Sequence, residues 1–475
     1  MLICDADVLG HGRCDLRIQD GVVAALGRFA PFPEEPVIAA SGGALLPGLH
    51  DHHIHLAALA ARAASVACGP PDVLDGEALH EALFMAPGDG WIRGVGYHES
   101  VLDALPDAAT LDRMVPDRPV RIQHRSGRMW LLNSRALDQL LAAGTPPPGL
   151  ERNAGRFTGR LFEEDAWLQR SLGSTPPDLG TTSAALARYG VTGVTDMSPR
   201  NDPAIAKHFA EQRSTAALLQ RCVLAGNLSL ANTSGEAWRL GPAKLHLHEA
   251  AFPAFGEAVA FIKAAHQQDR AVAVHCVSEV ELVFALAAIE EAGAMPGDRI
   301  EHVSVASPQL LEQMARLNLH ACVQPRFVAE RGDRYLLDVE PRHHPDLYRL
   351  GSLAARGIPL AGGSDAPYGS DDPWLAMAAA VSRRTAAGAI IGPEEALDPE
   401  QALALYLADP LDFTRERTIK IGATADLCLL DRPWAEARLR LTSDDVAATF
   451  VAGEIIHQRV NEPPIQSKPG AEPTA

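Results

Sequence analysis

The chain has 475 residues, of which 47% are hydrophobic and 21% are charged, an ordinary composition for a globular protein. This balance excludes a disordered scaffold, a collagenous fibre and a small disulfide framework. With 42 Lys and Arg against 60 Asp and Glu, the formal net charge is −18, which argues against nucleic acid or an anionic membrane surface as the partner.

The cysteines and the N-terminus indicate the compartment. Seven cysteines are scattered without a CxxC pair, and several lie inside apolar runs such as Ala321-Cys322-Val323, as buried thiols in a reducing compartment do. The first residues, Met1 to Asp7, contain acids where a signal peptide has bases. No uncharged apolar run reaches the roughly 18 residues of a transmembrane helix. We therefore expect a cytoplasmic protein.

Both ends of the chain show the pattern of short strands. Apolar runs broken by glycine fill residues 1–46, and the same pattern returns in 418–460. Two strand-rich ends around a different middle predict one small β-sandwich domain built from both termini. The last stretch, 461–475, is rich in Pro, Ser, Gly and Glu, and we expect a flexible tail there.

The middle of the chain, residues 47–417, repeats a β-branched run, a polar turn and a helical stretch. Eight runs are expected to be strands: the residues up to Leu56, then 64–68, 190–197, 243–248, 271–277, 299–305, 319–324 and 358–362. Eight strands alternating with helices predict an α/β fold, the (β/α)₈ TIM barrel. Because the gap after the second run is too long for one crossover, residues 74–187 are interpreted as an α/β subdomain inserted after barrel strand 2.

Ionisable residues gather at the ends of these predicted strands. His53 and His55, two residues apart, point to the same side of the first strand and can grip one divalent metal. Lys244 lies in the fourth predicted strand, where an inward amine is costly unless its charge is removed or paired. Reaction of the neutral amine with CO₂ would give a carbamate that can bridge two metals.

Three further residues complete the pattern. His275 ends the fifth predicted strand, His302 the sixth and Asp365 the eighth. Singly, each could be a core histidine or a capping carboxylate. Together with the first three residues they occupy the strand ends at which TIM barrels have their active sites.

The pattern resembles the amidohydrolase superfamily, in particular its amidohydrolase-3 branch of YtcJ-like enzymes. The motifs that carry the resemblance are PGLHDHHIH at 47–55, Lys244, AVHCVSE at 273–279, RIEHVSV at 299–305, VQP at 323–325 and GGSDAPYGSDDP at 362–373. The resemblance implies two divalent metal ions, with zinc as the default. One ion would be bound by His53, His55 and Asp365, the other by His275 and His302, and carboxylated Lys244 would bridge them.

The resemblance also implies hydrolysis of a non-peptide carbon–nitrogen bond in an amide, an N-formyl or N-acyl compound, or a cyclic amide. A hydroxide that bridges the metals would attack the carbonyl carbon, with Asp365 as the general base and then the general acid. The expected partner is a small-molecule substrate, without nucleic acid or membrane, and the expected assembly is a homodimer.

The chain departs from the family pattern after Lys244. Relatives usually continue with Asp-Gly and a long closing loop, whereas here Leu-His-Leu-His-Glu follows. His246 and His248 share the alternation of Lys244 and are candidate substrate contacts, or else imidazoles hydrogen-bonded around the ligands. Arg128 stands where relatives usually have a histidine, and it would either favour an anionic substrate or form a surface salt bridge. Cys68, at the end of the second predicted strand, is a weaker candidate for a metal bridge.

Two other functions stay open. A mononuclear deaminase of the same superfamily would use one metal and a Glu on strand five, whereas Glu279 lies beyond the predicted strand end. A catalytically dead binding or regulatory relative would have lost ligands, whereas all six positions are kept. Metal content separates the three: two ions per chain for the hydrolase, one for the deaminase and none for the dead relative.

Overall fold

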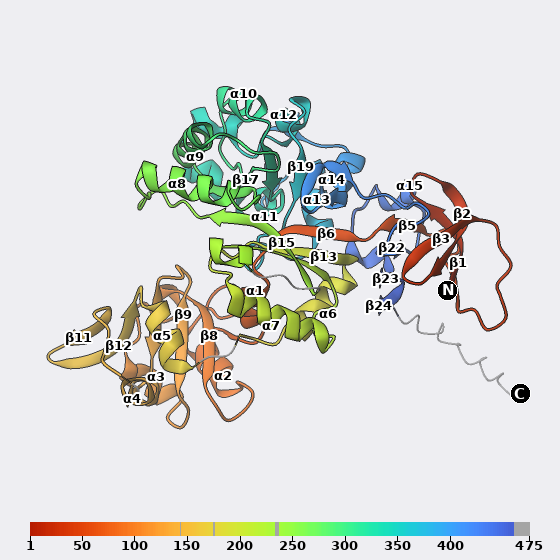
Figure 1. Cartoon of the computed structure of the whole chain (residues 1–475). Coiled ribbons are helices and arrows are strands. Elements are labelled where there is room, and N and C mark those ends of the chain that lie inside the picture. Colours follow the sequence, from red (N-terminus) through yellow and green to blue (C-terminus); the bar gives the residue numbers. More distant parts are fainter. Residues whose placement is uncertain (143, 174–175, 233–236, 460–475) are drawn as a thin grey trace, which may run out of the picture. The chain divides into compact units, whose positions relative to one another are not determined.

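The computed structural model describes residues 1–142, 144–173, 176–232 and 237–459, so the predicted tail 461–475 lies outside the described residues. The chain divides into two compact units (Figure 1). One unit contains Met1–Leu56 and Leu179–Ala475, and the other contains Ala57–Asp178. Within the described residues, no helix combines the length and the apolar character needed to cross a bilayer.

The larger unit contains the predicted barrel. In the described part of the chain, eight parallel strands form one sheet in chain order: β6 (Leu49–Ile54), β13 (Val191–Asp196), β14 (Arg221–Gly226), β15 (Trp238–Leu245), β16 (Val272–Cys276), β17 (Arg299–His302), β18 (His320–Val323) and β19 (Leu360–Gly362). Two backbone hydrogen bonds connect the residues after β19 to the end of β6, the first strand, and so close the barrel. They run from Asp365 N to His53 O at 2.7 Å and from His55 N to Ala366 O at 2.8 Å. The predicted TIM barrel is confirmed.

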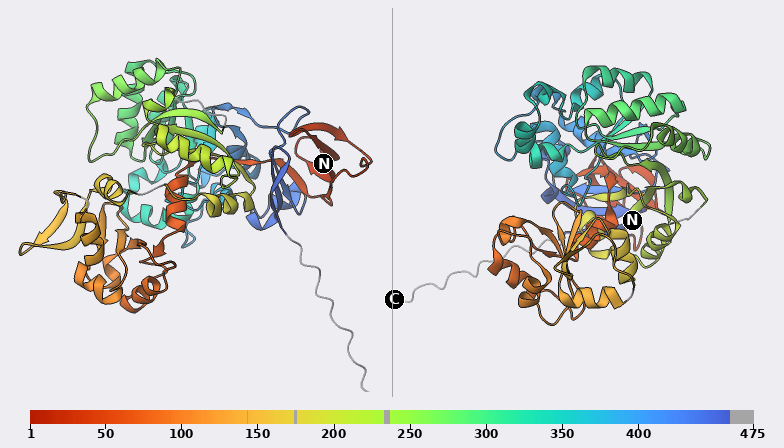
Figure 2. Two further views of the ribbon diagram at one scale, coloured as in Figure 1. Left: turned by 60° about the horizontal axis from the view of Figure 1, so that its bottom comes forward. Right: turned by 90° about the vertical axis from the view of Figure 1, so that its left-hand side faces the viewer.

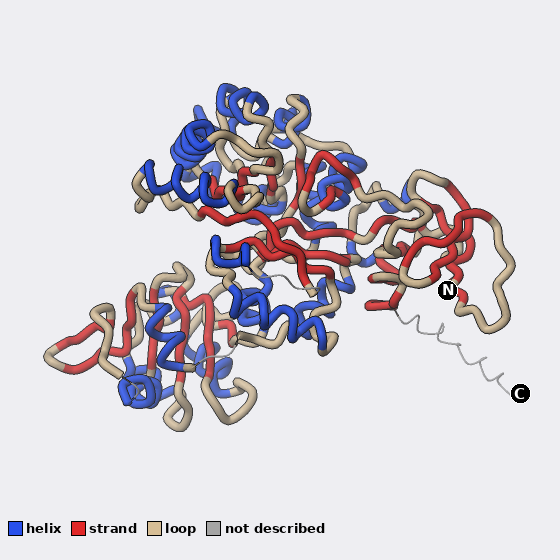
Figure 3. The backbone as a smooth tube through the Cα atoms, in the orientation of Figure 1, coloured by secondary structure: helices blue, strands red, loops and turns tan. Residues whose placement is uncertain are grey.

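Helices surround the strands of the barrel (Figure 3). They are α6 (Gly180–Arg188), α7 (Pro203–Ser214), α8 (Phe255–His266), α9 (Glu279–Ala292), α10 (Pro308–Arg316), α11 (Arg326–Asp338), α12 (Leu350–Ala355), α13 (Pro373–Ser382) and α14 (Pro399–Leu407). Helix α9 shows why they start where they do, because Ser278 and Glu281 form a reciprocal capping box at its N-terminus. Its buried side chains, among them Leu282 and Ile289, are spaced as one helical face.

The predicted second barrel strand, residues 64–68, is wrong. β7 (Val66–Ala67) pairs with β8 (Ile92–Tyr97) in a separate sheet of the other unit. The second and third barrel strands are β13 and β14, and β14 was not among the strands predicted from the sequence. The insert therefore follows barrel strand 1, not strand 2. A short apolar run shows that a strand forms but not which sheet it joins, because the pairing depends on distant residues.

The unit Ala57–Asp178 is an α/β assembly of its own. Its described sheet has the order β11-β12-β10-β9-β8-β7, with β9 (Val120–His124), β10 (Met129–Leu132), β11 (Leu150–Asn153) and β12 (Arg156–Phe162). Helix α1 (Leu56–Ala63) leads into the unit, which also contains α2 (Gly76–Phe84), α3 (Ala108–Met114), α4 (Ser134–Ala142) and α5 (Asp165–Leu172). Cys68 is fully buried in its core with Leu79 and Ile122, so it does not end a barrel strand.

Both ends of the chain enter one sheet, as predicted. The order is β24-β23-β22-β5-β1-β2-β3, with β4 beside β1, and Figure 2 shows the N-terminal and C-terminal strands side by side. The strands are β1 (Leu2–Val8), β2 (Gly12–Gln19), β3 (Val22–Gly27), β4 (Val37–Ala39), β5 (Ala44–Pro47), β22 (Leu427–Leu430), β23 (Val446–Val451) and β24 (Glu454–Gln458). One core joins them, including Ile3, Leu16, Leu45, Leu427 and Phe450. The hairpin β20 (Ala408–Asp409) and β21 (Asp412–Glu416) precedes the C-terminal strands, and α15 (Trp434–Ala437) lies between β22 and β23.

Candidate metal centre

The six predicted metal ligands lie at or just beyond the carboxyl-terminal ends of barrel strands: His53 and His55 on and after β6, Lys244 on β15, His275 on β16, His302 on β17 and Asp365 after β19. Parallel strands of a barrel end on the same face, so residues far apart in the sequence converge there.

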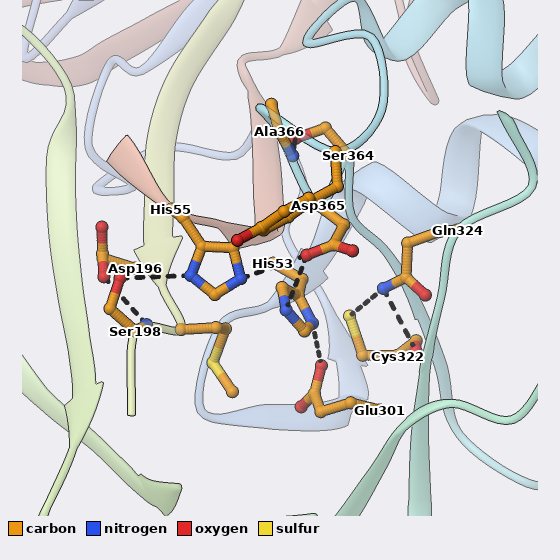
Figure 4. Close-up of polar contacts among 12 residues, drawn as sticks. His53, His55, Asp196, Ser198, Glu301, Cys322, Gln324, Ser364, Asp365 and Ala366 are labelled. Carbon is orange, nitrogen blue, oxygen red and sulfur yellow. Dashed lines mark hydrogen bonds and ion pairs between the residues drawn. The ribbon is translucent and has the colours of Figure 1, made fainter. Parts of the chain in front are cut away.

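His53, His55 and Asp365 form the first group. The Nε2 atoms of His53 and His55 lie 3.3 and 3.1 Å from Oδ1 of Asp365, and Figure 4 shows the carboxylate directed toward both rings. One ligand atom from each residue lies within 4.8 Å of the others, as around a single ion. Burial opposes ionisation of Asp365, but hydrogen bonds from the two histidines hold its pKa well below the usual range. The group is therefore an anionic, metal-competent set.

His302 connects the first group to His275. Its ring centroid lies 4.9 Å from that of His53 and 4.5 Å from that of His275. Burial lowers the pKa of His302 to about 3, so the ring is neutral at physiological pH. Neither of its ring nitrogens has a hydrogen-bond partner among the described residues, although both are buried. Buried nitrogens of this kind normally have partners, and a metal ion would provide one.

Lys244, like His302, has a buried polar atom without a partner among the described residues. It is only 4% exposed, and its Nζ atom makes no hydrogen bond within the described part of the chain. Burial lowers the pKa of this amine, while the charges of Glu301 and Asp365 partly oppose that effect. A buried amine that is driven toward its neutral form fits the carbamate chemistry expected from the sequence.

Two of the residues have an uncommon backbone. The φ angles of His302 and Asp365 are +73° and +54°, in the left-handed region that few residues other than glycine adopt. Such a conformation costs about 1–3 kcal/mol and is concentrated at functional sites. The two residues lie at the end of β17 and just after β19, among the predicted metal ligands.

Glu301 is a site residue that was not among the predicted ones. Its Oε2 atom lies 2.5 Å from Nδ1 of His53, and Nε of Arg299 donates to Oε1 at 2.6 Å. Burial alone would raise the pKa of Glu301, but the charges of Arg299, Lys244 and His53 hold it well below its usual range. The ionised carboxylate holds the His53 ring through Nδ1, so Nε2 faces Asp365, and a metal ion bound there would replace the proton on Nε2. The signal was present in the RIEHVSV motif, where Glu301 precedes His302.

A second carboxylate, Asp196 on β13, supports His55 indirectly. Nδ1 of His55 lies 3.1 Å from the hydroxyl of Ser198, whose backbone N–H donates to Asp196 at 3.0 Å. The other oxygen of Asp196 accepts from Leu56 N at 2.7 Å. Asp196 thus ties the residues after β13 to the end of β6, a role that its place in the sequence did not indicate.

The three candidate substrate contacts, His246, His248 and Arg128, have different surroundings in the structure. His246 is exposed, and its ring centroid lies 4.5 Å from that of His275, which places it at the edge of the cluster. His248 is exposed, and its Nδ1 atom accepts from Ala250 N at 3.2 Å in the following turn. Arg128 lies in the unit Ala57–Asp178 and forms an exposed salt bridge with Glu163, the second of its two predicted roles.

The donor set suits a divalent metal. Imidazole nitrogens with carboxylate oxygens are ligands that zinc accepts, and Fe, Mn or Ni use similar sets. The partnerless atoms of Lys244 and His302 lie in the same cluster as the anionic group. The residues therefore fit a metal centre.

Comparisons with known proteins identify the family of the chain. The chain matches the model of the Amidohydrolase family over residues 36–457. It is 26% identical to the putative amidohydrolase YtcJ of Bacillus subtilis (strain 168), covering 93% of this chain and 95% of the relative. It is 25% identical to the N-substituted formamide deformylase of Arthrobacter pascens, covering 93% and 94%.

Two solved structures share the fold. Both are uncharacterized metal-dependent hydrolases, one from Pyrococcus horikoshii OT3 and one from Pyrococcus furiosus. The first has a TM-score of 0.76 at 20% identity and covers 91% of this chain and 97% of its own. The second has a TM-score of 0.74 at 22% identity and covers 91% and 98%.

Proposed function

We propose, from the premise that this chain belongs to the amidohydrolase family, that it hydrolyses the carbon–nitrogen bond of a small N-formyl, N-acyl or cyclic amide at the centre around Asp365. Within that class we place N-substituted formamides first, because one relative of similar length is a deformylase of such compounds.

The observation that carries the proposal is the convergence of six residues from five barrel strands, with buried polar atoms of Lys244 and His302 that lack a partner among the described residues. His53, His55 and Asp365 would hold one ion, His275 and His302 a second, and Lys244 as its carbamate would join the two. Zinc is the metal we propose first. When bound, the ions supply Lewis acidity, which makes a water molecule more acidic and polarises a carbonyl group.

We propose that Asp365 transfers the proton. Its Oδ1 atom accepts from both histidines, so the side chain is held in one orientation, and its low pKa keeps it ionised. A carboxylate held in this way can take a proton from water and return it to the leaving nitrogen. His246, exposed beside His275, is positioned to contact the substrate.

The test is a substrate screen with zinc-loaded protein. N-substituted formamides, other N-acyl compounds, hydantoin-like rings and carbamates are incubated with the wild type, and the released amine and acid are measured. We expect amine and formate from the formamides and about two metal ions per chain. One ion per chain with release of ammonia would instead support a deaminase. A protein that binds no metal and cleaves none of the compounds would support a binding relative.

A further inference from the structure

A cavity of about 470 Å³ lies at the end of the barrel opposite to the metal centre. On one side it is lined by the first residues of β6, β13, β14 and β15, and on the other by the segment 409–427 that leads to β22. Cavities that bind small molecules usually measure about 300–1,000 Å³. The predicted metal ligands on β6 and β15 lie at the other ends of those strands, and the remaining ligands belong to strands that do not line the cavity, so the proposed hydrolysis does not use it.

The lining is rich in positive charge. The described lining residues include five basic side chains, Arg221, Arg239, Arg415, Arg417 and Lys420, against the three acids Asp409, Glu416 and Asp426. The whole chain carries a net charge of −18, so a local excess of cations is opposite to the overall field. Like charges around one space repel one another, and an anion inside would remove that repulsion.

The three acids of the lining neutralise only part of its positive charge, because five basic side chains face them. Asp426 is already engaged, since Arg221 Nε donates to Oδ2 at 2.6 Å and Ala452 N donates to Oδ1 at 2.7 Å. Asp409 accepts from Leu411 N at 3.0 Å within the hairpin turn. These hydrogen bonds hold both carboxylates in the wall of the cavity, from which their charges also favour the cationic form of Arg417.

Arg417 gives the cavity a fixed, partly buried cation. Its Nη2 atom donates to Tyr406 O at 2.8 Å and its Nε atom to Ala408 O at 3.3 Å, which holds the guanidinium in place. Burial lowers its pKa to about 10, so it stays charged at neutral pH. Within the described residues, neither Arg417 nor Arg239, Arg415 or Lys420 forms an ion pair.

We propose that this cavity binds a small molecule through a phosphate or carboxylate group, with Arg417 fixed in the wall and Arg239 and Lys420 as exposed cations at its edge. Guanidinium groups bind the oxygens of both anions through charge-assisted hydrogen bonds. Apolar lining from Val223, Ile419 and Leu427 would contact the rest of the molecule.

The experiment is calorimetric titration of the full chain with pyrophosphate, with inorganic phosphate and with citrate. The test variant is Arg239→Ala/Lys420→Ala, which leaves Arg417 and its backbone hydrogen bonds intact. The control is Lys263→Ala/Arg334→Ala, which removes the same charge from exposed positions on α8 and α11. Thermal melting of both variants verifies that they fold.

We expect saturable binding at one site, weakened about tenfold or more in the test variant and unchanged in the control. Tighter binding of the phosphates than of citrate identifies a phosphate-bearing ligand, and the reverse order identifies a carboxylate. Equal weakening in both variants would mean non-specific attraction and would overturn the proposal. Absence of binding to the wild type at millimolar concentrations of all three anions would overturn it too.

Discussion

Nδ1 of His53 and Oε2 of Glu301 lie 2.5 Å apart, although 248 residues separate them in the chain. Each of the two residues has a further partner: Glu301 accepts from Arg299, and His53 contacts Asp365. Each member fixes the next, so a guanidinium deep in the barrel orients the imidazole at the metal centre. Such supporting contacts adjust ligand orientation and basicity.

Replacing Asp365 with Asn should reduce turnover by several orders of magnitude while metal is retained. The amide keeps an oxygen for coordination but cannot accept the proton, so we expect a loss of about 10²–10⁴-fold or more in kcat. Metal content and amide hydrolysis are measured on the same sample. Wild-type activity in a metal-replete Asn variant would contradict the role of Asp365.

Replacing Lys244 with Ala should remove one metal ion. Because a carbamate places two oxygens at the end of a long side chain, formate or acetate can fill that space once the side chain is gone. We expect the added acid to restore part of the metal content and activity. Unchanged metal content in the variant would exclude the bridge, and His246 would be the next residue to test. Loss of stability without rescue would indicate only a buried amine.

Replacing Glu301 with Gln should weaken the metal centre and the fold together. The substitution leaves the buried charge of Arg299 without its carboxylate, which we expect to cost about 3 kcal/mol in the free energy of unfolding. Metal affinity should fall about 10–100-fold because His53 loses its anionic partner.

The control for this variant is Glu290→Gln, at an exposed ion pair with Arg316 whose atoms lie 3.0 Å apart. A surface pair of that kind is worth about 1 kcal/mol or less. Denaturant unfolding and metal titration of both variants provide the comparison. Equal effects in the two variants would show that Glu301 has no special role.

Gly363 packs directly against His53. A Cβ atom at this position would lie 2.5 Å from Cβ of His53 and 2.6 Å from its backbone nitrogen. Gly363→Ala should therefore displace the end of β6, with a cost of about 1–3 kcal/mol from overpacking and a loss of bound metal. Gly256→Ala on α8 is the control, because a Cβ atom there would lie more than 4 Å from every described residue outside its own helical turn. Full metal binding by Gly363→Ala would show that β6 can shift without harm to the centre.

The sequence by itself determined the local features. The alternation of strands and helices predicted the barrel, and the strand-like ends predicted a β domain from both termini, because periodicity and glycine placement are local properties. It also placed His275, His302 and Asp365 at strand ends, since a parallel barrel brings all such ends to one face.

Only the tertiary structure decided which distant residues meet. The run at 64–68 forms a strand as expected, but its partner is β8 and not a barrel strand. Arg128 has Glu163 as its partner, and Glu301 has His53. A motif contains the residue types but not the distance between atoms that lie hundreds of residues apart. That distance is fixed by strand register and by the packing of the whole barrel, to which every strand contributes.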